Sequence, residues 1–287
     1  MAFDSLPPQS PINPRADAYA ETALILSKEA AASCRCVLDV PYGDDYWQKI
    51  DLYLPDDPSA TGLPVFLNLH GGGWTHGYKE WLGFQAPPIV SLPAIYISVS
   101  YRLAPDHLYP TPLEDTFRAL KWTVDHITDH GGDPNRIFIG GHSAGGHLSS
   151  LATLRRDMAA DFGLPDNVIK GCFPVSGVYE IDFEDADLKE WAEGPGSVML
   201  RSRDDAKAAS PITHIEGNRT PFYITWADGD GIYATVTGPR MVEALSRQPG
   251  RVAWHVFEDK NHFSVNLDTA DENNRWVQTL RSWMTAN

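Results

Sequence analysis

An α/β fold, with a mostly parallel central sheet and helices on both faces, is predicted by three features of the sequence. Short apolar runs of strand length alternate with segments whose apolar residues recur at helical spacing. Several runs are rich in β-branched and aromatic residues, which is typical of strands covered on both faces. The length of 287 residues, with 43% hydrophobic and 21% charged residues, fits one globular α/β unit.

The elements are expected in a regular order along the chain. A helix over residues 17–33 comes first, and residues 42–45 between the first two strands are typical of a hairpin turn. The expected strands are residues 36–41, 49–54, 64–70, 94–100, 137–140, 169–175, 222–227 and 252–257. The expected later helices are residues 113–130, 144–158, 237–247 and 269–285.

We expect a single domain over residues 1–287, with two distinctive segments. Residues 1–33 are predicted to be an N-terminal helical arm. Residues 179–217 interrupt the alternation of strands and helices, because they are rich in charged and small residues and show no strand pattern. They fit a cap-like insertion above the sheet, built around short helices.

Charge and composition exclude several classes of protein. The chain has 23 Lys and Arg against 38 Asp and Glu, a net charge of −15, and lacks the basic cluster that nucleic-acid binding requires. No apolar run approaches the roughly 18 residues of a membrane span. Residues 1–14 lack the basic and apolar regions of a signal peptide. We therefore expect a cytoplasmic protein without nucleic-acid or membrane partners.

Neither a metal nor another cofactor is expected. Cys34, Cys36 and Cys172 are an odd, sparse set, and no second Cys or His pair at ligand spacing accompanies the first two. His126 and His130 stand four residues apart on a predicted helix, but the Glu of a zinc-protease motif is missing. Cys34 and Cys36 are better interpreted as plain strand residues, and His126 and His130 as a solvent-facing pair.

The sharpest functional signal is Gly141-His142-Ser143-Ala144-Gly145, which follows a predicted strand and precedes a predicted helix. This is the context of a G-x-S-x-G nucleophile elbow. Glycines flank the serine because so tight a turn leaves no room for a Cβ. Ser143 is therefore the candidate nucleophile, and the Ala144 N–H at the helix N-terminus is available to a developing oxyanion.

A second glycine-rich motif, HGGGW at residues 70–74, directly follows another predicted strand. Its bare backbone allows a reacting carbonyl to approach closely. We expect the N–H groups of Gly72, Gly73 and Ala144 to form a three-donor oxyanion hole. The alternative is a phosphate-binding loop, but the spacing of a P-loop or of a dinucleotide motif does not follow.

The general base that would take the Ser143 proton is expected late in the chain. In folds that carry a G-x-S-x-G nucleophile elbow, the serine comes first along the chain, the acid second and the histidine last. His262 lies in the loop after the last predicted strand and has the right position. His255 lies inside a strand pattern and His214 inside the insertion, so that both are interpreted as structural.

The acid that orients the base is expected after the strand at residues 222–227, where Asp228 and Asp230 are the candidates. Asp230 is favoured because it follows the turn at Gly229. A chain that turns there can bring the next side chain back toward the histidine.

Together these motifs resemble the α/β-hydrolase superfamily, in the branch of hormone-sensitive-lipase-like esterases and kynurenine formamidases (arylformamidases). The motifs HGGGW at residues 70–74 and YRLAP at residues 101–105 resemble those of the hormone-sensitive-lipase-like esterases. Six other motifs resemble those of the arylformamidases. They are LDVPYGD at 38–44, KIDLY at 49–53, GHL at 146–148, VSGVY at 175–179, SP at 210–211 and NHF at 261–263. The resemblance spans nearly the whole chain from about Arg15. It implies an α/β-hydrolase fold with Ser143 as nucleophile, Asp230 as acid and His262 as base.

We therefore predict a cofactor-free serine hydrolase, of carboxylesterase or arylformamidase type, that cleaves a small ester or aryl formamide through an acyl-enzyme. The substrate is expected to be aromatic or short-acyl, between aromatic walls formed by Trp74, Tyr179, Trp191 and Trp226. The alternative is a non-catalytic ligand-binding receptor of the same fold, in which a triad position is normally lost. The sequence leaves the oligomeric state open, a homo-oligomer included.

Overall fold

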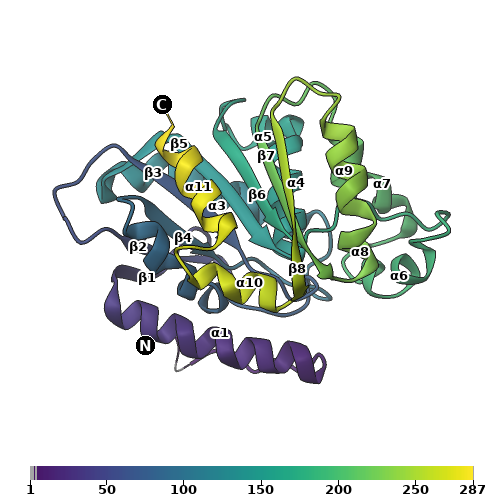
Figure 1. Ribbon diagram of the computed structural model, residues 1–287, viewed down its shortest axis with the longest axis horizontal. Coiled ribbons are helices and arrows are strands. Elements are labelled where there is room, and N and C mark those ends of the chain that lie inside the picture. The colour runs from purple at the N-terminus through teal and green to yellow at the C-terminus, as the bar shows by residue number, and fades with distance from the viewer. Residues whose placement is uncertain (1–2, 4, 287) are drawn as a thin grey trace.

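The computed structural model describes residue 3 and residues 5–286 of the chain. Within these residues, eight strands form a sheet in the order β1-β2-β4-β3-β5-β6-β7-β8 (Figure 1). β1 with β2 and β2 with β4 are antiparallel, and all later neighbours are parallel. The strands are β1 (Arg35–Pro41), β2 (Lys49–Leu54), β3 (Leu63–Leu69), β4 (Ile95–Val99), β5 (Gly132–His142), β6 (Ile169–Val175), β7 (Phe222–Gly229) and β8 (Val252–Asn261). The predicted mostly parallel sheet is confirmed.

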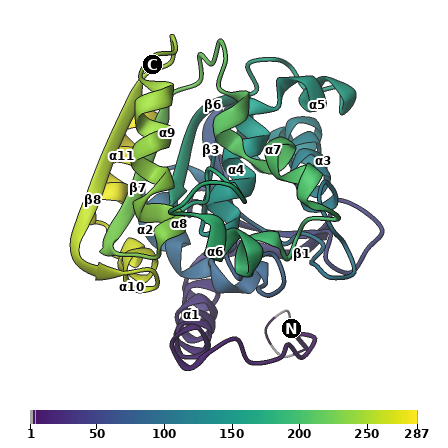
Figure 2. The same cartoon turned by 90° about the vertical axis from the view of Figure 1, so that its right-hand side faces the viewer.

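Helices cover both faces of this sheet (Figures 1 and 2). The α-helices are α1 (Pro14–Ser33), α2 (Ala86–Val90), α3 (Thr111–His126), α4 (Ala144–Leu154), α5 (Arg156–Asp161), α6 (Lys189–Glu193), α7 (Ala206–Ala209), α8 (Ile232–Thr235), α9 (Thr237–Leu245), α10 (Ser264–Leu267) and α11 (Arg275–Thr285). Single 3-10 turns are η2 (Lys79–Trp81), η3 (Gly83–Gln85), η4 (Ile127–His130), η5 (Pro195–Ser197), η6 (Arg203–Asp205), η7 (Pro211–His214) and η8 (Asp268–Ala270). In the described part of the chain, no helix is long and apolar enough to cross a membrane.

The hydrophobic core is divided by the sheet into two parts. Because strand side chains alternate between faces, Val65 and Leu67 of β3 enter the core with α3, α4 and α9. Phe66 enters the opposite core, with α2, α10 and α11. Burial of each such side chain stabilises the fold by about 1.5–3 kcal/mol. The sheet is therefore held rigidly between its helices, and its strand ends are fixed points for a site.

All the expected helices are found with shifted ends, and in two of them a side-chain hydrogen bond explains the shift. The helix expected over residues 144–158 divides at Arg155, which has a ψ of 61° and a guanidinium bound to Asp157. The helix expected from residue 269 begins at Arg275, because the Asn274 side chain caps it there. Both differences come from side-chain hydrogen bonds that compete with the helical backbone.

The N-terminal helix α1 lies at the end of the molecule opposite the C-terminus (Figure 1). Tyr19 on this helix packs with Trp81 and Phe84 from the segment that follows β3. The Tyr19 hydroxyl also accepts a hydrogen bond from Asn266 at 2.8 Å. Since Asn266 follows β8, α1 is attached where the parallel strands end.

Residues 179–217 contain no strand and fold into α6, α7, η5, η6 and η7. Arg240 on α9 binds Glu180, Asp185 and Asp187 of this segment at 2.9–3.2 Å. These ion pairs attach the start of the segment to α9. The helix α6 lies beside α8 in both views (Figures 1 and 2).

Candidate active site

Ser143 stands at the sharp turn between β5 and α4. Its φ of 55° and ψ of −117° are strained for a residue with a side chain. A Cβ on Gly141 would stand 2.3 Å from the backbone of Gly145, and one on Gly145 would stand 2.0 Å from the Leu69 carbonyl oxygen. The Ser143 N–H donates to the Val175 carbonyl oxygen at 2.9 Å. Close packing of backbone therefore enforces the turn that presents this serine.

His262 and Asp230 come together because they follow the neighbouring parallel strands β8 and β7. The His262 Nδ1–H donates to one Asp230 carboxylate oxygen at 2.6 Å. The second oxygen accepts hydrogen bonds from the Ser176 hydroxyl at 2.6 Å and the Ala227 N–H at 2.9 Å. Because Nδ1 carries the proton, Nε2 of a neutral His262 is left as an acceptor, as a general base requires.

The Asp230 carboxyl stays ionised although its side chain is completely buried. Burial by itself raises the pKa of a carboxyl group. The hydrogen bonds from His262, Ser176 and Ala227, with the charge of His262, outweigh burial and lower the pKa of Asp230. An ionised carboxylate in this position holds the imidazole in one tautomer and stabilises the imidazolium when it forms.

Asp228, the other candidate acid, has different partners. Its carboxylate oxygens accept hydrogen bonds from the Asp259 N–H at 3.0 Å and the Lys260 N–H at 3.2 Å. These bonds lower the pKa of Asp228 and hold the end of β8. The structure therefore pairs His262 with Asp230, and Asp228 supports the strand that carries His262.

A second histidine, His142, supports His262 from one side. Its Nε2–H donates to the His262 carbonyl oxygen at 2.7 Å, and the two rings lie 4.5 Å apart. Burial, followed by the neighbouring His262, lowers the pKa of His142 to about 3, so that this ring is neutral near pH 7. The sequence motif that contains His142 does not indicate which group its side chain binds.

The glycine loop after β3 lies directly against the serine. A Cβ on Gly71 would stand 3.1 Å from the Ser143 Cβ. Gly72 and Gly73 have φ of 110° and 59°, in the region that favours glycine. Within the described chain, the N–H groups of Gly72, Gly73 and Ala144 have no hydrogen-bond acceptor. They are free to bind an oxygen of a ligand.

Trp74 braces this loop against α4 and the insertion. Its indole N–H donates to His147 Nδ1 at 3.1 Å, and His147 Nε2–H donates to the Ala209 carbonyl oxygen at 2.6 Å. Burial lowers the pKa of His147 to about 4, which keeps Nδ1 unprotonated and able to accept. The Ala104 N–H donates to the Trp74 carbonyl oxygen at 2.9 Å. The free N–H groups of the loop are thus held on a rigid support.

Two cavities open at Ser143. The larger has a volume of about 290 Å³ and is lined by Ser143, His262, Gly72 and Gly73, among others. The smaller, of about 140 Å³, shares Ser143 and Gly73 with it and extends to Ala144. His262 lines the larger cavity and is not among the residues that line the smaller one.

Of the four aromatic walls expected from the sequence, Trp74 and Trp191 line the smaller cavity. Tyr179 and Trp226 line neither cavity at Ser143. Tyr179 is 1% exposed in the core, and Trp226 stacks on Trp254 with ring centres 6.0 Å apart. Both side chains belong to the core cluster on the face of the sheet that α3, α4 and α9 cover.

Sequence reasoning missed several residues that surround the site. Tyr19, Tyr233 and Phe263 line the larger cavity, and the Tyr233 ring stands edge-on to His262 at 5.2 Å. Ser176 lies in the VSGVY motif at residues 175–179, which by itself does not indicate a role for this side chain. The signal for Tyr233 and Phe263 was their position close to the acid and the base along the chain, whereas nothing local indicated Tyr19.

Metal ligands do not gather in this region. Across residues 3 and 5–286, no group of three or more His, Cys, Asp or Glu side chains could hold a metal ion. Cys34, Cys36 and Cys172 are free thiols, and burial raises the pKa of each.

Comparison with known proteins gives relatives over most of the chain. The family model described as BD-FAE matches residues 50–245. The "Probable carboxylic ester hydrolase LipM" of Mycobacterium tuberculosis is 33% identical over 237 residues, which cover 74% of this chain and 52% of LipM. The chain likewise spans little more than half of the related esterases LipQ and LipC. A kynurenine formamidase of Danio rerio is 31% identical over 252 residues, covering 86% of this chain and 81% of that protein.

Solved structures share the fold. The crystal structure of EstE1, a thermophilic and thermostable carboxylesterase cloned from a metagenomic library, matches with a TM-score of 0.77. The two chains are 23% identical, and the match covers 96% of this chain and 99% of EstE1. This likeness confirms the fold that the sequence motifs implied.

Proposed function

Because this chain belongs to the BD-FAE family of α/β-hydrolases, we propose that it is a serine hydrolase that cleaves small carboxylic esters or aryl formamides. One observation carries the proposal: Ser143, on its strained turn, lines the same cavity as His262, whose ring is held by the Asp230 carboxylate. A serine becomes a nucleophile when a base takes its proton, and the base needs an acid that fixes its tautomer.

In the proposed reaction, the Ser143 hydroxyl oxygen attacks the substrate carbonyl while His262 Nε2 takes the hydroxyl proton. The N–H groups of Gly72, Gly73 and Ala144 bind the oxyanion, and each such donor lowers the barrier by about 3–4 kcal/mol. His262 then protonates the leaving alcohol or amine, and the acyl group stays on Ser143. A water deprotonated by His262 releases the carboxylic acid and restores the serine.

The proposed orientation of the substrate rests on the two cavities. His262 must protonate the leaving group, and His262 lines the larger cavity. The leaving group therefore occupies the larger cavity beside Tyr19 and Phe263, whose rings suit an aromatic group. The acyl group then occupies the smaller cavity against Trp74 and Trp191. A volume of about 140 Å³ is close to that of a cavity that holds one benzene molecule, so it accommodates a short acyl group of up to about six non-hydrogen atoms.

We propose that the chain is one α/β-hydrolase domain in which residues 1–33 and 179–217 complete the substrate site. Tyr19 from the N-terminal arm and Pro195 and Val198 from the insertion all line the larger cavity, which supports this role. The insertion would then act as a cap over the serine.

Replacement of the proposed nucleophile tests the assignment. In Ser143→Ala, turnover of p-nitrophenyl acetate is expected to fall by roughly 10⁴-fold or more, because the attacking oxygen is lost. Ser246→Ala is the matched control, since Ser246 is exposed and bonds only to its own helix. Retained turnover in Ser143→Ala would contradict the assignment of Ser143 as the nucleophile. A native chain that neither turns over p-nitrophenyl acetate nor is labelled by a fluorophosphonate would favour a ligand-binding receptor instead.

A comparison of substrates tests which kind of bond the protein cleaves. Comparing kcat/KM for N-formylkynurenine with that for p-nitrophenyl acetate and butyrate separates a formamidase from an esterase. Both reactions pass through the same tetrahedral chemistry at Ser143, so the Ser143→Ala variant serves as the blank for each substrate.

A further inference from the structure

A larger cavity, of about 630 Å³, lies at the opposite edge of the sheet from the serine. Its lining includes Arg136 on β5, Lys170 on β6 and Arg251 directly before β8, together with Trp283 on α11. These residues lie toward the amino ends of parallel strands, whereas Ser143 follows the carboxyl end of β5. The cavity is therefore separate from the proposed catalytic site.

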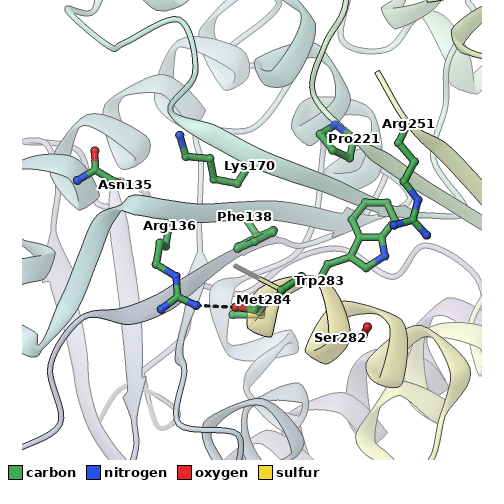
Figure 3. A pocket seen from close by; sticks show the side chains of 10 residues that line it. Asn135, Arg136, Phe138, Lys170, Pro221, Arg251, Ser282, Trp283 and Met284 are labelled. Atoms are coloured by element: carbon green, nitrogen blue, oxygen red, sulfur yellow. Dashed lines mark hydrogen bonds between the residues drawn. The ribbon is translucent and has the colours of Figure 1, made fainter. Parts of the chain in front are cut away.

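Three cations line this cavity, and none of them has a counter-ion in the described part of the chain. Among the described residues, no acidic side chain lines it, and none of Arg136, Lys170 and Arg251 takes part in an ion pair. Arg136 donates to the carbonyl oxygens of Gly62 and Met284 at 2.9 and 2.8 Å, the latter drawn in Figure 3. Lys170 also donates to a backbone carbonyl, at 2.7 Å. Bonds to carbonyls satisfy donors but neutralise no charge, so the positive charge persists in a chain whose net charge is −15.

Flat apolar side chains stand beside these cations. The Arg251 guanidinium lies over the Trp283 ring at 4.8 Å, and Figure 3 shows the two side by side. The Trp283 ring is held edge-on by Phe173 at 4.9 Å and is only partly buried. Phe138 and Met284 complete the apolar lining between Arg251 and Arg136. The cavity thus combines a rigid aromatic wall with cationic groups along its edges.

We propose that this cavity is a second ligand site, which takes an organic anion with a flat apolar body, an aromatic carboxylate or phosphate. The oxyanion pairs with Arg136, Lys170 and Arg251, whose remaining N–H groups suit carboxylate and phosphate oxygens. The aromatic body lies against Trp283 and Phe138. A volume of about 630 Å³ lies within the usual range for small-molecule sites. The site does not depend on the activity proposed for Ser143.

Calorimetric titration of the full chain tests this site, with any affinity tag at the N-terminus because Ala286 lines the cavity. The ligands are 2-naphthoate, 2-naphthyl phosphate, the neutral 2-naphthamide and inorganic phosphate. We expect one of the aromatic anions to bind at least about tenfold more tightly than both the neutral amide and inorganic phosphate. Which of the two anions binds more tightly identifies the oxyanion.

Variants locate the binding. Lys170→Gln/Arg251→Gln is expected to weaken binding of the aromatic anion by about tenfold or more, because two of its counter-charges are lost. Lys121→Gln is the control, since Lys121 pairs with Asp125 on α3 and lies outside the cavity. Trp283→Leu, which keeps the cations, is expected to weaken the binding of 2-naphthoate but not the binding of inorganic phosphate.

Three results would overturn the proposal. One is equal affinity for 2-naphthamide and the aromatic anions, which would show that charge plays no part. Another is unchanged binding in Lys170→Gln/Arg251→Gln, which would show that the anion binds elsewhere, for example at Ser143. The third is inorganic phosphate binding as tightly as the aromatic anions, which would show that the apolar wall plays no part.

Discussion

At the scale of single residues, the candidate site depends on side chains whose hydrogen-bonding roles are set by their neighbours. Asp230 uses both carboxylate oxygens, and the Ser176 hydroxyl occupies the one that His262 leaves free. Ser176 itself has a φ of 51° at the end of β6, so its backbone is strained like that of Ser143. We therefore propose that Ser176 is a positioning residue that acts through Asp230.

The roles of the two aspartates can be separated by matched substitutions. Asp230→Asn is expected to lower kcat by roughly 10²–10⁴-fold, because an amide that donates to Nδ1 shifts the His262 proton to Nε2 and removes the base. Asp228→Asn, two residues away, is the control and should change kcat less than about twofold. The measurement is kcat for p-nitrophenyl acetate. A larger loss of kcat in Asp228→Asn than in Asp230→Asn would assign the acid that orients His262 to Asp228 instead.

At the scale of elements, the site is formed where the strand ends meet short helices of the insertion. The helices α6 and α8 bring Trp191 and Tyr233 together, with ring centres 5.6 Å apart. Trp191 lines only the smaller of the two cavities at Ser143, whereas Tyr233 lines both. The size of the proposed acyl site is thus controlled by one helix of the insertion.

Trp191→Ala is expected to change the acyl preference. Removal of the indole enlarges the smaller cavity, so the ratio of kcat/KM for p-nitrophenyl hexanoate to that for the acetate should rise about tenfold or more. Trp254→Ala is a matched control, because Trp254 is 55% exposed and lies outside both cavities. An unchanged ratio would contradict the placement of the acyl group in the smaller cavity.

His147 connects α4 to the HGGGW loop and to α7, and this connection depends on pH. Because burial lowers the pKa of His147 from 6.5 to about 4, the unfolded chain binds a proton that the folded chain does not bind between these values. The free energy of unfolding therefore decreases as the pH falls from about 6.5 toward 4.

Urea unfolding at about pH 7 and pH 5 measures this effect. His147→Gln lacks the titrating ring, so its loss of stability between these values should be smaller than that of the native chain by about 2 kcal/mol. His126→Gln, at an exposed position, should leave the difference unchanged. Equal pH dependence in the native chain and His147→Gln would show that the ring is not held neutral.

At the scale of the whole molecule, the antiparallel start of the sheet is held by a buried ionic cluster. Lys79, 2% exposed on η2, binds Asp39 of β1 and Asp51 of β2 at 2.9 Å each, and also its neighbour Glu80. Burial raises the pKa of Asp51 and Glu80. The cluster attaches the first two strands to the segment on which α1 packs.

Lys79→Met is expected to lower the free energy of unfolding near pH 7 by about 3–5 kcal/mol, because buried carboxylates lose their cation. The loss should shrink at acidic pH, where the raised pKa values of Asp51 and Glu80 favour their neutral forms in the folded chain. Urea unfolding of Lys79→Met and of the surface control Lys121→Met makes the comparison. Equal losses in the two variants would mean that the cluster contributes nothing to stability.

The sequence by itself determined the α/β class, most strand positions and the turn that carries Ser143. These follow from local rules: side-chain periodicity along strands and helices, and the need for glycine at Gly141 and Gly145, where a Cβ would meet backbone. Chain order predicts His262 as the base and an acid after the strand at residues 222–227, and the turn at Gly229 favours Asp230 over Asp228.

Only the tertiary structure decided which other side chains surround the serine. Tyr19 reaches the cavity because α1 docks at the strand ends, while Tyr179 and Trp226 turn into the core. Likewise Arg136 and Arg251 lie far apart in the chain, and only the sheet order brings them to one cavity. Such contacts depend on which faces of separate elements pack together, and no local pattern of residues encodes that.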